Sequence, residues 1–122
     1  MSGRIEESST TAALSNALVA LHKEQFGRGP TLVRSHFAGP DVSVTIFQDA
    51  LLPAEKALAE MGEHLRVQET RLFFQEATRD RFIKTIEDVV GRKVFSFHST
   101  CDARTGTVIE IAVFERRDGS AD

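Results

Sequence analysis

The 122-residue sequence contains no tryptophan, no tyrosine and only one cysteine. Its nine aromatic residues are all phenylalanines, which bury area without a polar group, so they are expected in a core rather than as stacking platforms for bases or sugars. A single cysteine excludes an internal disulfide, and a cytoplasmic protein is the simplest interpretation. No apolar run approaches about 18 residues and no signal-peptide pattern is present, so neither membrane insertion nor export is predicted.

The sequence also lacks a large excess of positive or of negative charge. Fifteen Lys and Arg oppose eighteen Asp and Glu, which gives a formal net charge of −3. Nucleic-acid binders normally carry a basic surplus or a basic stripe, so no nucleic-acid partner is predicted. The two signs are interleaved, as in RDRFIKTIEDVVGRK, which is typical of a solvated helix face. Length and composition predict one domain over residues 1–122, with flexible polar ends at about 1–8 and 116–122.

The first half of the chain predicts a helix followed by a β-hairpin. TTAALSNALVALHKEQF has leucines at helical spacing, and the segment GRGP (27–30) ends the helix. GRGP does not predict a phosphate-binding loop, because such a loop leads from a strand into a helix and this segment does the reverse. Val42, Val44 and Ile46 then alternate with polar residues, which predicts a strand with that apolar side buried. Gly39-Pro40-Asp41 is the expected turn between this strand and residues 31–37.

Helical spacing returns at Pro53 and continues to residue 90. One helix of that length would extend about 57 Å, more than the roughly 30 Å span of a small domain. It must break, with Gly62 or Thr78–Asp80 as candidate positions, or project and pack on another subunit. We favour one long, bent helix in a homodimer.

A second hairpin follows, with its turn at Asp102–Gly106. Residues 29–36 align with residues 91–98, so the chain appears as two αββ units. The predicted fold class is α+β: a four-stranded antiparallel sheet with a short N-terminal helix and a long central helix on one face. Two groups of residues are each expected to share a face of the second hairpin: Ile109, Ile111 and Val113 in one strand, and Phe95, Phe97 and Cys101 in the other.

The histidines and the cysteine predict no metal site and no catalytic thiol. His98 and Cys101 are three residues apart on one strand, so their side chains should point to opposite faces. Cys101 is in phase with phenylalanines and is interpreted as a small buried hydrophobic residue. His22 and His64 lie in predicted helices without a partner at ligand spacing. No cofactor and no catalytic residue is predicted, and an enzyme is not the favoured class.

One ligand site remains as an alternative. His36 and His98 occupy equivalent places in the two units, so their imidazoles are candidates to meet across the sheet, with Ser99 and Asp102 as further contacts. The competing interpretation is two exposed histidines, each with at most one hydrogen bond. His98, Ser99 and Asp102 would then be ordinary polar residues of the second hairpin.

Three consecutive large apolar residues, Leu72, Phe73 and Phe74, cover more of the central helix than one apolar stripe requires. They predict either a protein interface or an unusually wide internal core.

Four segments together resemble one known family: HKEQFGRGPTLVR, LLPAEKALAE, IEDVVGRKV and FHSTCDARTGTVIEIAVF. Over about residues 10–115 the chain is similar to the MpsC-like (YbcI-like) family of small bacterial proteins. That resemblance implies association with a membrane-potential-generating and inorganic-carbon (bicarbonate or CO₂) uptake system. It supplies no catalytic residues.

The function expected from these features is a non-enzymatic accessory or regulatory protein that acts by protein–protein contact. Such a protein would be a cytoplasmic homodimer, peripheral to the inner membrane through subunits of a membrane transport complex. The alternative is a small-ligand or metal sensor that uses His36 and His98.

Overall fold

A computed structural model describes residues 2–116 of the chain, and their side chains from residue 9 onward. The flexible end predicted at residues 116–122 lies, apart from Arg116, outside the described residues. The elements in chain order are α1 (Ser2–Phe26), β1 (Leu32–Phe37), β2 (Val42–Gln48), α2 (Pro53–Glu60), α3 (His64–Ala77), α4 (Arg79–Val90), β3 (Val94–Asp102) and β4 (Thr107–Phe114).

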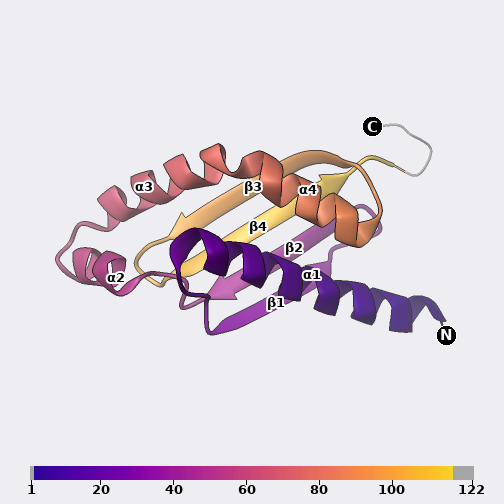
Figure 1. The fold of residues 1–122 in the computed structure, drawn as a ribbon, viewed down its shortest axis with the longest axis horizontal. Coiled ribbons are helices and arrows are strands. Elements are labelled where there is room, and N and C mark those ends of the chain that lie inside the picture. The colour runs from indigo at the N-terminus through magenta and orange to yellow at the C-terminus, as the bar shows by residue number, and fades with distance from the viewer. Residues whose placement is uncertain (1, 117–122) are drawn as a thin grey trace.

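The four strands form one antiparallel sheet in the order β1-β2-β4-β3. Each hairpin pairs within itself, and β2 and β4 join the two hairpins in the middle of the sheet. The long helices α1, α3 and α4 all lie over the same face, and α2 lies at one end (Figure 1). The predicted α+β fold with helices on one face is therefore confirmed. α1 has 25 residues and is longer than the short helix that the sequence predicts.

The central helix is not continuous, so the favoured prediction of one long helix is wrong. The chain breaks at both candidate positions. Gly62 has a φ of 87°, a left-handed conformation that glycine adopts without steric cost, and it separates α2 from α3. Thr78 separates α3 from α4, and its Oγ1 donates a hydrogen bond to the Phe74 carbonyl oxygen at 2.7 Å. Of the three shorter helices, α3 and α4 lie over the sheet and α2 lies at its end (Figure 1).

The helices cover the side of the sheet opposite to the predicted one. On β2, Ser43, Thr45 and Phe47 are buried beneath the helices, whereas Val42, Val44 and Ile46 point away and are only half-buried. On β4 the covered side holds Val108, Glu110, Ala112 and Phe114, and the other side holds Ile109, Ile111 and Val113.

Hydrogen bonds allow these polar residues to lie under the helices. Ser15 of α1 donates to Ser35 Oγ at 2.8 Å, and Ser35 Oγ lies 2.9 Å from Thr45 Oγ1. A buried hydroxyl that keeps a partner avoids most of its desolvation penalty. The main core then joins α1, α4 and the sheet through Leu14, Leu18, Leu21, Phe47, Phe82, Ile86, Phe97, Val108, Ala112 and Phe114, with Ala50 beside them.

β3 departs from regular alternation at its start. A register shift lies between Val94 and Ser96, so Phe95 is an extra residue in a bulge and its side chain is 55% exposed. Phe97 is buried and Cys101 packs against the core. The prediction that Phe95 shares their face is therefore wrong.

Candidate functional site

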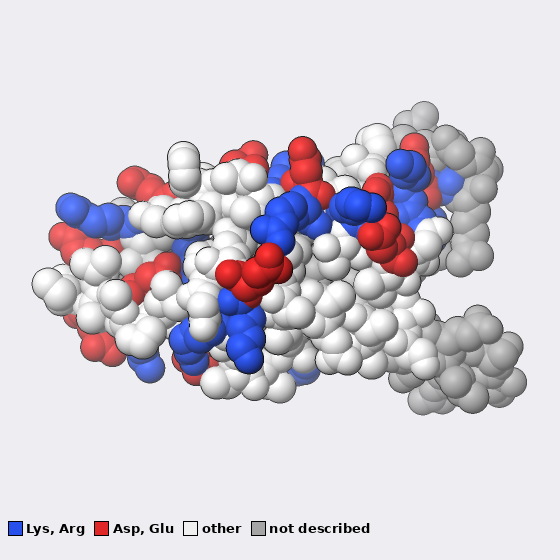
Figure 2. All heavy atoms as spheres, viewed as in Figure 1, with Lys and Arg blue, Asp and Glu red and all other residues white. Residues whose placement is uncertain are grey.

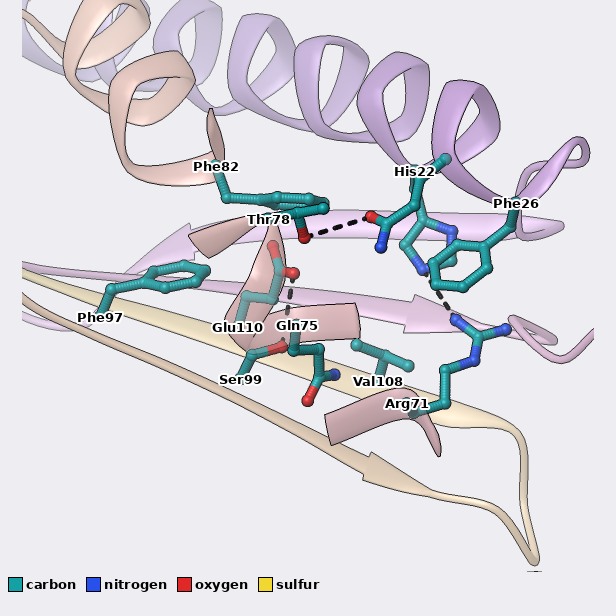
Figure 3. Close-up of a pocket in the computed structure, with 11 residues that line it drawn as sticks. His22, Phe26, Arg71, Gln75, Thr78, Phe82, Phe97, Ser99, Val108 and Glu110 are labelled. Atoms are coloured by element: carbon teal, nitrogen blue, oxygen red, sulfur yellow. Dashed lines mark hydrogen bonds between the residues drawn. The ribbon is translucent and has the colours of Figure 1, made fainter. Parts of the chain in front are cut away.

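A group of buried polar side chains lies between α1, α3 and the covered face of the sheet (Figure 3). His22 and Gln25 come from α1, Arg71 from α3, and Glu110 from the central strand β4. Glu55, in the first turn of α2, completes it. We refer to these five residues as the buried polar cluster.

Arg71 is the best-connected member of the buried polar cluster. Its side chain is 1% exposed, and its Nε and Nη2 donate to the two carboxylate oxygens of Glu55 at 2.8 and 2.6 Å. Nη2 also donates to the Ala50 carbonyl oxygen at 2.7 Å. The guanidinium carbon lies 3.9 Å from the centre of the Phe26 ring. Such a bidentate, stacked arrangement suits arginine and not lysine.

His22 is neutral in this setting. Burial, and next the positive charge of Arg71, lower the pKa of His22 from 6.5 to about 4. Arg71 Nη1 lies 3.3 Å from His22 Nε2, and because a guanidinium can only donate, Nε2 is the acceptor. The proton of the neutral ring therefore resides on Nδ1. The ring also stacks on Phe47, with 5.2 Å between centroids.

Glu110 is a buried carboxyl that forms no ion pair with any described residue. Burial raises the pKa of Glu110 from 4.5 to about 8, and a hydrogen bond from Ser99 opposes this rise. That hydrogen bond is long, with 3.5 Å between Ser99 Oγ and Glu110 Oε2. Glu110 is therefore mostly protonated at neutral pH, and it can exchange a proton in the physiological range.

Three buried side-chain atoms have no hydrogen-bond partner within the described part of the chain: His22 Nδ1, Gln25 Nε2 and Glu110 Oε1. All three residues line one small cavity. The volume that the centre of a water molecule can occupy in it is about 10 Å³. Two N–H donors and one carboxyl oxygen complement a single water, which can accept twice and donate to the carboxyl. The two donors and the adjacent guanidinium disfavour a metal cation there.

The buried polar cluster is suited to structure and to proton binding rather than to covalent chemistry. Three of its contacts occupy the Arg71 guanidinium, so that group is not free to bind an anionic substrate. Ser99 and Glu110 both line the cavity, but their hydrogen bond is long, and a carboxyl that is mostly protonated at neutral pH does not serve as a base for the serine. What the cluster offers is one carboxyl that titrates near pH 8 beneath the helices.

The structure does not bring His36 and His98 together. His36 on β1 is opposite Val44, and His98 on β3 is opposite Ile111, while Val44 and Ile111 pair with each other. The two histidines thus share a row and a face but lie on opposite edge strands, about 14 Å apart at three strand spacings. The alternative in which both imidazoles form one site within a single chain is therefore contradicted by the strand order.

The other predicted ligand-binding residues also lie apart. Ser99 points to the covered face and donates to Glu110, whereas His98 points away and lies 3.3 Å from Ser96 Oγ. Asp102 Oδ1 accepts from the Arg104 N–H at 3.0 Å and shapes the hairpin turn. No group of three or more His, Cys, Asp or Glu that could hold a metal occurs among the described residues.

His98 and Ser99 nevertheless both line an open groove at the β3 edge. It has a volume of about 220 Å³, and Gln75, Glu76 and Arg79 line its helical side. Cys101 is not part of it: that side chain is half-buried, and burial raises the pKa of its thiol.

Leu72 and Phe73 are exposed on the outer side of α3, at 54% and 69%, so the predicted wide internal core is wrong for these two. Phe74 is partly covered, since its ring contacts the Phe26 ring with 5.9 Å between centroids. Whether this surface is an interface stays a prediction.

Sequence patterns alone do not single out His22, Arg71 and Glu110. Arg71 appears as one of many charges on a solvated helix, and its position next to Leu72 gives no sign of burial. Glu110 did carry a signal, because it interrupts the apolar strand TVIEIAVF. The signal was hidden because the other side of that strand was expected to face the helices.

No helix in the described part of the chain is both long and apolar enough to cross a membrane. No curated protein and no solved structure gave a significant match to the chain. One family did, described as "Na+-translocating membrane potential-generating system (MpsC)", over residues 6–116. Since that match spans most of the 122 residues, the chain belongs to the MpsC family.

Proposed function

We propose that this protein is a non-enzymatic accessory subunit that binds a protein component of a Na⁺-translocating, membrane-potential-generating system. The family description supplies the system. The supporting observation in the structure is an exposed apolar surface on α3. The proposal places the chain on the cytoplasmic side, peripheral to the inner membrane through its partner, and extends to the inorganic-carbon uptake that the sequence resemblance implies.

The α3 apolar surface consists of three exposed side chains: Leu65, Leu72 and Phe73. Leu65 and Leu72 are seven residues apart, and Phe73 follows, so all three lie on the outer side of one helix. Exposed apolar side chains at this spacing suit a protein groove or a partner helix. Large exposed apolar groups of this kind are unusual on a protein that works alone.

Charge on the helical side is consistent with a protein partner. Figure 2 shows Lys and Arg side chains interspersed with Asp and Glu side chains over the helices, with no extended area of one sign. An anionic lipid surface or a nucleic acid would favour a basic area. Glu69 and Glu76 flank the apolar side chains on α3 and give the surface a polar rim.

The test is affinity capture of the tagged protein from its native cell, compared with a Leu72→Glu/Phe73→Glu variant. We expect the original protein to recover a membrane-embedded ion-translocating subunit and the variant to lose it. Lys84→Glu, a charge change at an exposed position of α4 outside this surface, is the matched control and should retain the partner. If the double variant still recovers the subunit, the α3 apolar surface is not the binding site. If the original protein recovers no such subunit, the proposal is refuted.

A second candidate function is binding of a small ligand in the β3-edge groove. The observation that favours it is that His98, Ser99 and Arg79 line one open groove. If this candidate is right, bicarbonate or a nucleotide should raise the melting temperature, and His98→Ala should abolish the rise. His36→Ala, on the opposite edge strand, is the control that should leave the rise intact.

A further inference from the structure

The side of the sheet that faces away from the helices is apolar at its centre, and no described element covers it. We call it the open face. Within the sheet, Val44 lies opposite Ile111 and Ile46 opposite Ile109, on the two central strands. None of these side chains belongs to the core that the helices cover. The centre of the open face consists of six half-buried aliphatic residues: Val42, Val44, Ile46, Ile109, Ile111 and Val113.

Polar residues rim this centre on the edge strands. Arg34 and His36 of β1 lie on one side of it, and His98 and Thr100 of β3 lie on the other. An antiparallel sheet with one solvated face normally alternates apolar-in with polar-out. Here the edge strands follow that rule except at Leu32, whereas the outward sides of the two central strands are mainly aliphatic and Ser43, Thr45 and Glu110 lie under the helices. Such a face resembles the inner face of a two-sheet sandwich.

We propose that a second copy of this chain covers the open face, so that two sheets stack face to face in a homodimer. The twofold axis runs parallel to the strands and places β1 of each copy over β3 of the other. This proposal does not depend on the proposed function, because it uses the opposite side of the molecule from the α3 apolar surface.

The charged residues of the open face favour this axis. Arg34 lies on one edge strand, in the row of Ile46, Ile109 and Thr100. Asp102 lies two residues beyond Thr100 on the other edge strand and therefore shares its face. A twofold axis along the strands preserves height along them, so Arg34 of each copy comes over the region of Asp102 of the other. The two opposite charges thus pair twice in one dimer.

Arg34 has no ion pair among the described residues, so it is available for this contact. An axis across the strands would instead place β1 over β1 and bring the two copies of Arg34 together. Like charges at an interface are unfavourable, so that arrangement is disfavoured.

The size of the open face suits a reversible dimer. Four strands of about six residues cover roughly 19 by 20 Å, or about 400 Å² in outline on each copy. Because side chains corrugate the surface, two stacked faces approach about 1,200 Å² of buried accessible surface, the lower end for specific interfaces. The aliphatic side chains of two such faces pack with the sheets about 10 Å apart.

The test is sedimentation of the full chain over about 1 to 300 μM, a range that brackets the dissociation constants of small interfaces. We expect a concentration-dependent dimer. Ile111→Asp should raise the dissociation constant at least about 100-fold, since it buries an unpaired charge. Val44→Thr, which keeps a β-branched shape, should raise it less. Leu72→Asp on α3 is the matched control and should leave dimerisation unchanged.

The proposed contact between Arg34 and Asp102 allows a second, independent experiment. It does not alter the apolar centre of the open face. Arg34→Glu should weaken the dimer, because it faces Asp102 of the second copy with a like charge. Adding Asp102→Asn should restore part of the affinity, since asparagine removes the repulsion and keeps an oxygen for the Arg104 N–H. Circular dichroism establishes that each variant is folded.

Three outcomes overturn the proposal. The first is a monomer at every concentration. The second is a dimer that survives Ile111→Asp in a folded protein. The third is a dimer that Leu72→Asp disrupts and Ile111→Asp does not, which would assign the interface to α3.

Discussion

Arg71 of α3 and Glu55 of α2 form a bidentate ion pair, with 2.6 Å between Nη2 and Oε1 and 2.8 Å between Nε and Oε2. The Glu55 Oε1 also accepts from the Leu52 backbone N–H at 2.8 Å and so caps the start of α2. Through Ala50, Leu52 and Glu55, one arginine of α3 fixes the loop between β2 and α2. The pair therefore ties α3 to the segment that runs from the end of β2 into α2.

Arg71→Lys should destabilise the protein by about 2–4 kcal/mol. A lysine keeps the charge but cannot donate to both carboxylate oxygens and to the Ala50 carbonyl from one planar group. Urea unfolding at neutral pH measures the loss. Arg81→Lys is the control, since Arg81 pairs with Glu24 on the surface, and it should change stability by less than about 0.5 kcal/mol. Equal effects of the two substitutions would contradict the importance of the buried pair.

Glu110→Gln should stabilise the protein in alkaline solution. Between pH 4.5 and about 8, Glu110 is protonated in the folded chain and ionised in the unfolded chain. Folding then takes up a proton, so the free energy of unfolding falls as pH rises through this range. Glutamine does not titrate, and the variant should exceed the original protein by about 3–5 kcal/mol at pH 9. Near pH 4.5 the two should agree within about 1 kcal/mol.

The measurement is chemical unfolding at a series of pH values, with both proteins in the same buffers. Glu115→Gln, at the residue that follows β4, is the control for loss of a carboxyl that is only half-buried. A difference between Glu110→Gln and the original that does not vary with pH would show that Glu110 is ionised in the folded chain.

His22→Gln should remove an acid sensitivity. The folded pKa of about 4 lies below the unfolded value of 6.5, so between these values only the unfolded chain binds the proton. His22 therefore makes stability fall by about 3 kcal/mol as pH drops from 6.5 to 4. The glutamine variant should lack this loss and keep a side-chain oxygen for Arg71. Subtracting its unfolding free energies from those of the original gives the histidine contribution directly.

His22 and Glu110 oppose each other between pH 4.5 and 6.5, because their linked protons move in opposite directions on unfolding. Their contributions to the pH dependence should cancel there and leave a net decline only from pH 6.5 to about 8. A His22→Gln protein should instead decline throughout pH 4.5 to 8. If the decline begins at the same pH in both proteins, the assigned His22 pKa is wrong.

The positions where the chain changes structure could be predicted from local chemistry. Gly62 and Thr78 both appeared as candidate breaks, since one residue favours left-handed backbone and the other competes for backbone hydrogen bonds. Preference for an unbroken helix failed because propensity does not report the length of the sheet that the helices must cover. Burial of the helices against the sheet, rather than helix propensity, determined that the chain breaks into α2, α3 and α4.

Which face of the sheet the helices cover could not be predicted from alternation. The pattern correctly groups Val44 with Ile46, and Thr45 with Phe47, but it does not say which group meets the helices. Choosing the more aliphatic group gave the wrong answer, because Thr45 and Glu110 can be buried once Ser35 and Ser99 donate or accept hydrogen bonds. The buried polar cluster was missed because Glu110 was assigned to the side away from the helices. In addition, the five residues of the cluster come from four separate segments of the chain.

Two adjacent residues on β2 test this assignment of faces. Phe47 is fully buried beneath the helices, and Phe47→Ala should cost about 3–5 kcal/mol, the usual range for a buried phenylalanine. Ile46 lies on the open face, and Ile46→Ala should cost about 1 kcal/mol in the monomer, from lost cross-strand contacts and lower strand propensity. Unfolding at concentrations well below dimerisation measures both, because association would add stability that Ile46→Ala removes. A larger cost for Ile46→Ala than for Phe47→Ala under those conditions would mean that the helices cover the other face. If the cost of Ile46→Ala grows with protein concentration while that of Phe47→Ala does not, the open face is the surface that associates.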